Sequence, residues 1–432
     1  MELFEILVLV ISFVLLLSLG VPISFSIGIS SLVTMLLSIT SLPSVTTVAQ
    51  RMATGIDSFA LLAIPFFILA GQLMNSGGIA RRLIDFAKVL VGKLPGGLAF
   101  VNILASMFFG AISGSAVAAA SAIGGFMTPV MEKEGYDKSF SAAVNITSAT
   151  TGLIIPPSNV LIVYSLASGG VSIAALFLAG YIPGILFGLS LMVVAFIYAK
   201  KHNYKVNVEF SFSDAVRKFF NAVPSLMLIF IVIGGIVAGY FTATEASAVA
   251  VLYAFILSVF VYKEIKFSDL PDILLSSAST TAIVMLLVGT SMAMSWVMAY
   301  ENIPQNVAAA LLALSSNKIV LLIIINVILL FIGTFMDMTP AVLIFTPIFL
   351  PVAVKLGIDP IHFGIMMVMN LSVGLCTPPV GSVLFVGCSV AGLPITKVIK
   401  PLLPMFLAML VALMLVTYIP ELSMFVPELF GF

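Results

Sequence analysis

Two apolar stretches of the sequence combine hydroxyl-bearing residues, glycine and a pair of prolines, and chemistry is expected at these places. They are ATTGLIIPPSN, from Ala149 to Asn159, and GLCTPPVGS, from Gly374 to Ser382. Proline removes a backbone N–H and disfavours helical torsions in the residue before it, so each segment should unwind at its centre. Unwound backbone offers carbonyl oxygens to a small cation, and the half-helix that follows offers N–H groups to a carboxylate. The sequence therefore predicts an ion or solute site at each break; a kinked helix with a purely structural role is the alternative.

Two further motifs are expected to face these breaks. ISGSA, from Ile112 to Ala116, interrupts the apolar run 97–131, and GTFMDMTP, from Gly333 to Pro340, interrupts the run 318–353. Each half of the first run has about 15 residues and reaches about 23 Å, which is less than the hydrocarbon thickness of about 30 Å. We predict two re-entrant helical hairpins whose tips carry these motifs to the middle of a membrane.

Pairing each tip with a break predicts two Na⁺ sites and one solute site. The first Na⁺ site consists of Ser113, Ser115, Thr150, Gly152 and Ser158, and the second of Gly333, Asp337, Thr339, Gly374 and Thr377. The solute, an organic acid anion, is expected to contact Ser113, Ser115, Ser158, Asn159, Asp337 and Ser382. For any single Ser or Thr, a hydroxyl bonded back to its own helix is the competing interpretation, but the repetition of the pattern favours ion binding. No catalytic residue is predicted, and no cofactor beyond Na⁺ as the coupling ion.

Asp337 is the acidic residue most expected to function, because an unpaired charge at the centre of a membrane helix costs at least ~2.5 kcal/mol. It can serve as a cation ligand, a hydrogen-bond partner of the solute or a proton carrier, or it can cap a helix inside the hairpin. Asp137 and Asp359 follow glycines just before the broken segments, so helix N-capping explains them. Glu245 lies at the start of a span, where a capping box and a functional role are equally expected.

The composition indicates a membrane protein with many spans. Of the 432 residues, 61% are hydrophobic and 8% are charged, whereas a soluble domain carries about 25% charge. Eighteen Lys and Arg balance eighteen Asp and Glu, which argues against a nucleic-acid partner. The sequence has two cysteines and two histidines, which argues against a disulfide framework and against a metal cluster held by these residues.

The two halves of the chain repeat at an offset of 222 residues. This shift places Pro129 on Pro351, Gly152 on Gly374, and Pro156 and Pro157 on Pro378 and Pro379. Five crossings and one hairpin per half make the second repeat enter from the opposite side, an inverted-topology repeat. The expected spans are 3–20, 22–40, 58–77, 172–199, 224–241, 244–262, 278–299 and 402–428, with amphipathic pieces at 79–95 and 302–315 and broken segments at 139–168 and 361–390.

The basic residues support this topology. With the N-terminus outside, fifteen of the eighteen Lys and Arg, Lys205 in the polar stretch 200–220 among them, fall on the cytoplasmic side. Arg51, Lys318 and Lys355 fall outside. This asymmetry is the one that the positive-inside rule describes.

With these motifs assembled, the chain resembles, over essentially its full length, the large membrane subunit of tripartite ATP-independent periplasmic (TRAP) transporters. The resemblance is carried by SGSA at the first hairpin tip, IIPPSN, YIPGIL at 181–186, the DMTP of the second tip and TPPVG. It implies Na⁺-coupled uptake by an elevator mechanism, in the inner membrane of a bacterium. It also implies two protein partners, a small four-helix membrane subunit on a separate chain and a periplasmic substrate-binding protein, besides the organic acid anion and the lipid bilayer.

The predicted fold class is an all-α polytopic membrane protein with an inverted repeat, two re-entrant hairpins and two broken helices, of elevator type. The transport domain is expected at 97–168 and 317–391, the scaffold with its interfacial arms at 1–96, 169–221 and 222–316, and a C-terminal span at 392–432.

Three other functions fit part of the pattern. A stand-alone elevator carrier for dicarboxylates or citrate shares the repeats and hairpins. An intramembrane hydrolase with Ser113 or Ser115 as nucleophile needs a base, and neither His202 nor His362 is expected near the hairpin tip. A channel would not require hairpins that open to opposite faces. Among acids, a C4-dicarboxylate and a sialic-acid-type sugar acid both remain open as the solute.

Overall fold

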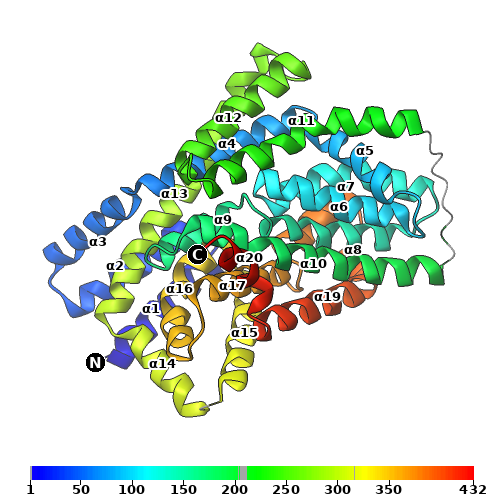
Figure 1. Cartoon of the computed structure of the whole chain (residues 1–432). Helices are drawn as coiled ribbons and strands as arrows, with labels where there is room; N and C mark the ends of the chain where they lie inside the picture. Colours follow the sequence, from blue (N-terminus) through cyan, green and yellow to red (C-terminus); the bar gives the residue numbers. More distant parts are fainter. Residues whose placement is uncertain (1, 203, 205–211, 316) are drawn as a thin grey trace.

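The computed structural model describes residues 2–202, 204, 212–315 and 317–432, and the regular structure within them is entirely helical (Figure 1). Part of the expected polar linker, with Lys205, lies outside the described residues. The helices of the first half are α1 Glu2–Ser18, α2 Ile23–Ser38, α3 Ser41–Ile56, α4 Ala63–Ser76, α5 Ile79–Val91, α6 Gly97–Ser113, α7 Ala116–Lys133, α8 Lys138–Ala149, α9 Asn159–Ala167 and α10 Ile173–Lys201.

The second half follows the same plan. Its helices are α11 Phe212–Val237, α12 Ala243–Phe255, α13 Leu270–Tyr300, α14 Ile303–Leu314, α15 Lys318–Phe335, α16 Met338–Lys355, α17 Pro360–Gly374, α18 Ser382–Ala391, α19 Ile395–Tyr418 and α20 Glu421–Leu429. Short 3-10 turns lie at Phe59–Leu62, Thr151–Leu153 and Phe267–Asp269, and a π-helical turn at Ile256–Val261 extends α12.

The helix bounds reproduce the 222-residue repeat. The shift carries α7 onto α16 residue for residue, and it carries the first residue of α10 onto the first residue of α19. The main difference is that α3 and α4 are two helices, separated at Asp57 and Ser58, whereas their counterpart α13 is one continuous helix of 31 residues. The repeat predicted from the turn-forming residues is thus present in the helices themselves.

The sequence analysis missed α3. Its residues include Pro43, Thr46, Gln50 and Arg51, so the segment contains no long apolar run that would predict a membrane helix. The helix is amphipathic and buries Ser44 and Val48, which indicates that packing against α2 and α13 stabilises it more than intrinsic propensity does.

Three predicted bounds were wrong. The expected span 402–428 is two helices, α19 and α20, which meet at Pro420. The expected span 278–299 begins earlier, at Leu270, and α11 begins at Phe212, inside the stretch expected to be a polar linker. The first turns of α13 and α11 contain charged residues, although the rest of each helix is apolar. A search for apolar runs alone therefore places the first residue of each helix too far along the chain.

The capping interpretations were confirmed. The Asp137 carboxylate accepts a hydrogen bond from the Phe140 N–H at 2.8 Å, and Asp359 accepts one from Ile361 at 2.7 Å. Glu245 and Thr242 form a reciprocal capping box at the start of α12. These three acidic residues therefore have local structural roles.

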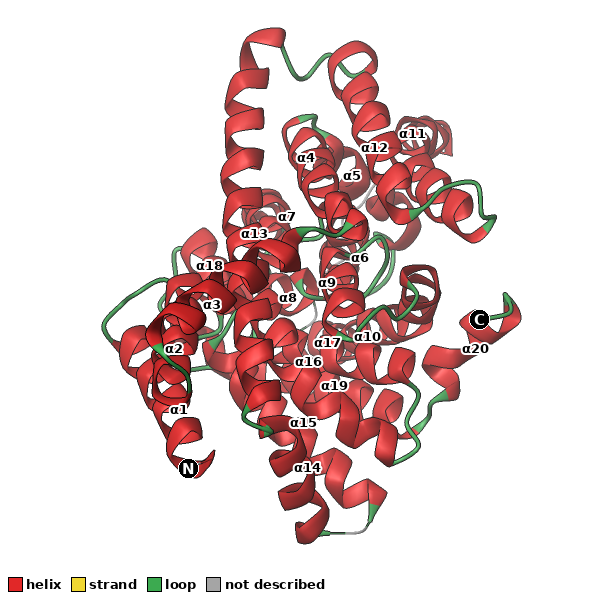
Figure 2. Cartoon of the chain, turned by 90° about the vertical axis from the view of Figure 1, so that its left-hand side faces the viewer, coloured by secondary structure: helices red, strands yellow, loops and turns green. Residues whose placement is uncertain are grey.

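The helices pack as two groups. One contains α1 to α4 and α11 to α13, in which α12 packs on α4 and α13 packs on α2, α3 and α4. The other contains α6 to α10 and α15 to α20, where α10 packs on α6, α17, α19 and α20. The amphipathic helices connect the groups, since α5 contacts both α6 and α11, and α14 contacts both α13 and α16. In Figure 2, α11 to α13 extend to one end of the molecule and α14 and α15 to the other.

Eight helices of the described chain are long and apolar enough to cross a membrane. They include α15 and α16, each with 18 residues, which corresponds to a length of about 27 Å. Helix length alone therefore does not distinguish a re-entrant pair from a spanning pair, and the re-entrant placement of the hairpins stays a prediction.

Candidate functional site

The first tip is a tight turn between α6 and α7. Gly114 has a φ of +63°, which favours glycine because other side chains rarely adopt it. Ser115 follows as the N-cap of α7, and its hydroxyl accepts a hydrogen bond from the Ala118 N–H at 3.2 Å. The Ser113 hydroxyl makes two long contacts of 3.5 Å, in which it donates to the Ser115 carbonyl and accepts from the Ser115 N–H. The tip thus presents one capping hydroxyl and one weakly engaged hydroxyl.

The first break runs from Thr150 to Ser158, between α8 and α9. As predicted, the helix stops before the two prolines and restarts at Asn159. The Ser158 hydroxyl donates to the Leu153 carbonyl at 2.6 Å, and the Thr150 hydroxyl donates to the Thr147 carbonyl at 3.0 Å. Both side chains are fully buried, so these bonds satisfy hydroxyl donors that have no access to water.

The second tip and break have the same layout. Met336 and Asp337 join α15 to α16, and the chain between α17 and α18 contains Pro378 and Pro379. The tip and the break are bonded to each other, since the Gly381 N–H donates to the Thr334 carbonyl at 3.0 Å. The Pro–Pro peptide bond is cis in both breaks.

A pair of glycines joins each break to its hairpin. A Cβ on Gly152 would lie 2.3 Å from the Cα of Gly110 in α6, and a Cβ on Gly374 would lie 2.6 Å from the Cα of Gly333 in α15. Only glycine allows backbones to approach so closely. Three of the predicted Na⁺-site residues, Gly152, Gly333 and Gly374, therefore have a structural reason to be glycine.

The two tips meet at one cavity of about 370 Å³. Five of the residues predicted from sequence line it: Ser113, Ser115, Asn159, Asp337 and Thr339. They come from α6, α7, α9 and α16, so the cavity is assembled from both repeats. Among the described residues that line it, Asp337 alone is charged, and its side chain is exposed to this space.

The remaining predicted residues lie outside this cavity. Thr150, Gly152 and Ser158 are buried behind the first tip, and Gly333, Gly374, Thr377 and Ser382 surround the second break. The Thr377 hydroxyl donates to the Val373 carbonyl at 2.8 Å, the back-bonded arrangement that competes with ion binding. Solute contact for Ser158 and Ser382 is thus not supported by the cavity that the tips form.

The second break nevertheless gathers backbone carbonyl oxygens, of which that of Leu375 also accepts a hydrogen bond from the Leu384 N–H at 3.4 Å. A Cβ on Gly381 would lie 2.7 Å from the carbonyl oxygen of Leu375 and 2.9 Å from that of Thr377, so both carbonyls point at this glycine. The neighbouring Ser382 hydroxyl is buried without a hydrogen-bond partner. Neutral carbonyl and hydroxyl oxygens are typical ligands of hard cations. A buried hydroxyl without a hydrogen-bond partner is unusual in proteins, and a bound ion would satisfy it.

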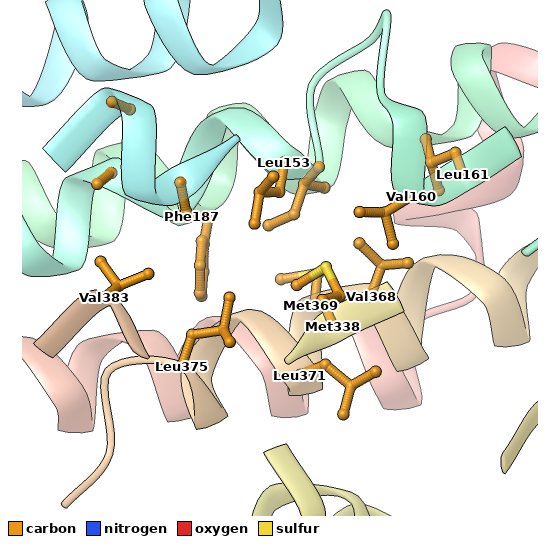
Figure 3. Close-up of a cluster of buried hydrophobic side chains, with 14 of the residues drawn as sticks. Leu153, Val160, Leu161, Phe187, Met338, Val368, Met369, Leu371, Leu375 and Val383 are labelled. Atoms are coloured by element: carbon orange, nitrogen blue, oxygen red, sulfur yellow. The ribbon is translucent and has the colours of Figure 1, made fainter. Parts of the chain in front are cut away.

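The two breaks touch each other. The Cys376 thiol lies 3.9 Å from the Thr150 hydroxyl and 3.4 Å from the Ile146 carbonyl. Buried apolar side chains of the two repeats also gather in one cluster; Figure 3 shows Leu153 of the first break together with Leu375 of the second break and Val383 of α18. The two predicted ion sites are therefore adjacent, at the contact between the repeats.

Sequence reasoning missed the side of the cavity that the other helix group supplies. Gln72 and Asn75 of α4 and Thr280 of α13 line it, with Ile64 and Ile68. Gln72 and Asn75 are three residues apart in an apolar helix, and hence on one face. Two amides on one face of a membrane span were the signal that could have identified them.

The histidines do not supply a base for Ser113 or Ser115. His202 follows α10, where its Nδ1 lies 2.9 Å from the Tyr198 carbonyl. His362 is buried in α17, with Nδ1 2.7 Å from the Ser423 hydroxyl. Neither lines the cavity, so the geometry does not favour the hydrolase alternative.

Comparison with known proteins agrees with this architecture. The profile of the DctM family, described as "Tripartite ATP-independent periplasmic transporter, DctM component", matches residues 10–422. The chain is 58% identical over 428 residues to the uncharacterized protein YgiK of Salmonella typhimurium, covering 99% of this chain and 98% of YgiK.

Two relatives with described transport functions also match. The C4-dicarboxylate TRAP transporter large permease protein DctM of Rhodobacter capsulatus is 42% identical, covering 92% of this chain and 93% of its own. The sialic acid TRAP transporter large permease protein SiaM of Vibrio cholerae is 40% identical, with coverages of 91% and 92%.

A solved structure shares the fold at low sequence identity. The YdaH transporter of Alcanivorax borkumensis superposes with a TM-score of 0.63 over 87% of this chain and 88% of its own, at 16% identity. This match supports the helical architecture alone. The profile and the relatives decide the family: the chain belongs to the DctM family and is the large permease component of a TRAP transporter, a transporter and not an enzyme.

Proposed function

We propose that this chain carries an organic acid anion across the inner membrane together with Na⁺. The observation that carries the proposal is the cavity between the two tips, which presents hydroxyls, amides and one carboxylate at the contact between the repeats. Relatives named for C4-dicarboxylate and sialic acid transport support an organic acid as the solute.

We assign one Na⁺ site to each repeat, at the place where its hairpin tip meets its broken helix. In the first, Ser113 offers a weakly engaged hydroxyl, while Thr150 and Ser158 retain hydroxyl lone pairs beside the unwound backbone. In the second, the carbonyl oxygens of Leu375 and Thr377 lie beside Gly381. The next residue, Ser382, has a buried hydroxyl without a hydrogen-bond partner, and Thr339 and Asp337 stand at the tip. Each net positive charge that enters gains ~2.3 kcal/mol per 100 mV of membrane potential.

The movement proposed is an elevator, in which one helix group slides against the other. The cavity lies between the groups, since α4 and α13 supply one wall and the tips supply the other. Helices α10 and α19 pack on the hairpin helices and the broken helices, so we place both in the moving body. This differs from the prediction from sequence, in which α10 belonged to the scaffold and α19 was a separate C-terminal span. The helices α1 to α4 and α11 to α13 form the static part, and α5 and α14 connect the two.

Two separate proteins are proposed to complete the transporter: a small four-helix membrane subunit and a periplasmic protein that delivers the acid. The family description, a component of a tripartite periplasmic transporter, supports two further components. A stand-alone carrier remains the competing function, and uptake by this chain in proteoliposomes without either partner would favour it.

Na⁺ dependence is the first test. We expect uptake of a radiolabelled acid by proteoliposomes of the complete transporter to require an inward Na⁺ gradient, with at least a tenfold loss when choline replaces Na⁺. An inside-negative potential should accelerate uptake if more positive than negative charge enters. Uptake that is equal in Na⁺ and choline would exclude the Na⁺-coupled mechanism.

Cross-linking tests the sliding movement. A Cβ on Gly71 of α4 would lie 3.3 Å from the Cα of Ser113 in the tip, which is within reach of a disulfide. The double variant Gly71→Cys with Ser113→Cys is made after Cys376 and Cys388 are replaced by alanine. Because Ser113 is assigned to an ion site, uptake by the reduced double variant is the reference, and we expect oxidation to abolish that uptake and reduction to restore it. Each single cysteine variant serves as the control. If the double variant transports at its full rate after its disulfide has been shown to form, the elevator movement is contradicted.

A further inference from the structure

The end of α8, where the first break begins, is closed by side-chain donors. The last carbonyl groups of a helix have no partner within that helix and need donors from elsewhere. The Thr150 hydroxyl donates to the Thr147 carbonyl at 3.0 Å, and the Thr151 hydroxyl donates to the Ser148 carbonyl at 2.6 Å. Both hydroxyl-bearing side chains are fully buried. Two of the carbonyls at the end of α8 are thus satisfied by the first break itself.

A third donor comes from the other repeat. The Cys376 thiol, in the second break, donates to the Ile146 carbonyl at 3.4 Å and lies 3.9 Å from the Thr150 hydroxyl. In a continuing helix the Thr150 N–H would reach the Ile146 carbonyl, but here it is bonded to the Ser148 carbonyl. A thiol is a weak donor, and Cys376 is fully buried, so no water competes with it for this carbonyl. The second repeat therefore helps to close the broken helix of the first.

The second break also holds the side chain of Ile146. A Cβ on Gly387 of α18 would overlap the Cγ1 atom of Ile146, so this side chain fills the space that glycine leaves open. Cys376 precedes the proline pair of the second break, and Gly387 follows it. Because both sides of the second break contact one residue of α8, a change in the shape of that break reaches the end of α8.

The thiol is not explained by the repeat itself. The 222-residue shift places Cys376 on Ile154 of the first break, whose side chain has no hydrogen-bond donor. The end of α17 uses donors from its own break, since the Thr377 hydroxyl and the Cys376 N–H donate to the Val373 carbonyl at 2.8 and 3.1 Å. The thiol contact thus connects the repeats from the second break to the first.

Cys376 lies between the two proposed ion sites. Its neighbours Leu375 and Thr377 supply the carbonyl oxygens beside Gly381 that we assign to the second ion, and its thiol points toward Thr150, which we assign to the first. An ion bound to those carbonyls would fix the backbone on both sides of Cys376, and would thereby hold the thiol against the end of α8. Binding at one site that favours the geometry of the other is positive coupling, and such coupling is reciprocal.

We infer that Cys376 is a positioning residue that couples the two Na⁺ sites, so that the two ions bind cooperatively. The inference rests on the proposed function, from which it takes the two sites, and adds the dependence of one site on the other. In this role the thiol contacts neither ion. It acts by holding the Ile146 carbonyl and, through the end of α8, the Thr150 hydroxyl.

The test follows Na⁺ binding at each break separately in the purified chain. Protection from amide hydrogen exchange is measured in the segments 149–159 and 374–382 as Na⁺ replaces choline at constant ionic strength. Since two coupled sites give a Hill coefficient between about 1 and about 2, we expect about 1.5 or more in the native chain, with one midpoint for both segments. In Cys376→Ala the coefficient should fall to about 1 and the two midpoints should separate by about threefold, because one hydrogen bond is lost.

Two further variants separate coupling from a purely structural effect. Cys376→Ser keeps a donor at this position and should retain a shared midpoint. Cys388→Ala, which removes the other buried cysteine, is the matched control and should leave the coefficient and both midpoints unchanged. If Cys376→Ala does not fold, Cys376→Val takes its place, since valine is close to cysteine in size and also lacks a donor.

Three outcomes overturn the inference. They are a Hill coefficient of about 1 in the native chain, native cooperativity in a folded Cys376→Ala or Cys376→Val protein, and an absence of Na⁺-dependent protection in both segments. None of them decides the proposed function, which is tested separately by Na⁺-dependent uptake of a labelled acid by the complete transporter. Uptake that requires Na⁺ together with two independent midpoints would leave the proposed function intact and remove the coupling.

Discussion

Replacement of Asp337 by asparagine is expected to reduce Na⁺-dependent uptake of the native acid by about 30- to 100-fold. Asparagine keeps the size of the side chain but removes the only charge among the described cavity residues. Hydrogen bonds to a charged group contribute about 1.5–3 kcal/mol, and each 1.4 kcal/mol corresponds to a factor of ten in affinity. The measurement is initial uptake by proteoliposomes of the complete transporter, with protein incorporation checked by quantitative blotting.

The same variant should remain folded. Removing a charge from a membrane protein interior relieves a desolvation cost, so the melting temperature of the purified Asp337→Asn chain should equal or exceed that of the native chain. The Asp359→Asn variant should retain native uptake, because this residue caps α17 away from the cavity. Native uptake by Asp337→Asn would show that the carboxylate has no part in transport.

A large loss of stability is expected from adding one methyl group at either glycine pair. In Gly152→Ala the new carbon would lie 2.3 Å from the Cα of Gly110, and in Gly374→Ala it would lie 2.6 Å from the Cα of Gly333. The opposing atoms are backbone atoms and cannot rotate away, so the hairpin and the break must separate. Overpacking of a core typically costs about 1–3 kcal/mol, and we expect the upper end of that range or more, with loss of transport.

Gly125→Ala is the matched control for this experiment. Gly125 lies within α7, and a Cβ there would meet nothing within 4 Å, so alanine should be neutral or slightly stabilising. Melting of the three purified variants in detergent, with and without Na⁺, measures the effect. Native melting temperatures for Gly152→Ala and Gly374→Ala would refute the close packing of backbone on backbone.

The breaks and the tips were predictable because their causes are local. Two adjacent prolines end a helix wherever they stand, and a shared 222-residue offset requires only that the turn-forming residues be compared. The amphipathic helix α3 was not predictable in this way. Its polar residues resemble a loop until α2 and α13 are present to bury Ser44 and Val48.

The cavity was predictable only in part, for a similar reason. Ser113, Ser115, Asp337 and Thr339 lie at helix ends created by the tips, and Asn159 lies at one created by the first break; these ends meet in the fold. Gln72 and Asn75 lie in the C-terminal half of the regular helix α4, where sequence does not indicate which neighbour the helix faces. Nor does sequence show that Thr150 and Thr377 hold their hydroxyls back on their own helices, since that depends on rotamers set by packing.

The close approach of Gly71 to the first tip bears on the sliding movement that we propose for the two helix groups. A Cβ at Gly71 would meet the carbonyl oxygen of Ser113 at 3.0 Å and its Cα at 3.3 Å, so a smooth backbone surface faces the tip. Interlocked side chains must leave their rotamers before two surfaces can slide, whereas two bare backbones need not. In the proposed movement, resistance at this point of the boundary is therefore low, and a larger side chain at residue 71, which also lines the cavity, would be expected to slow the stroke.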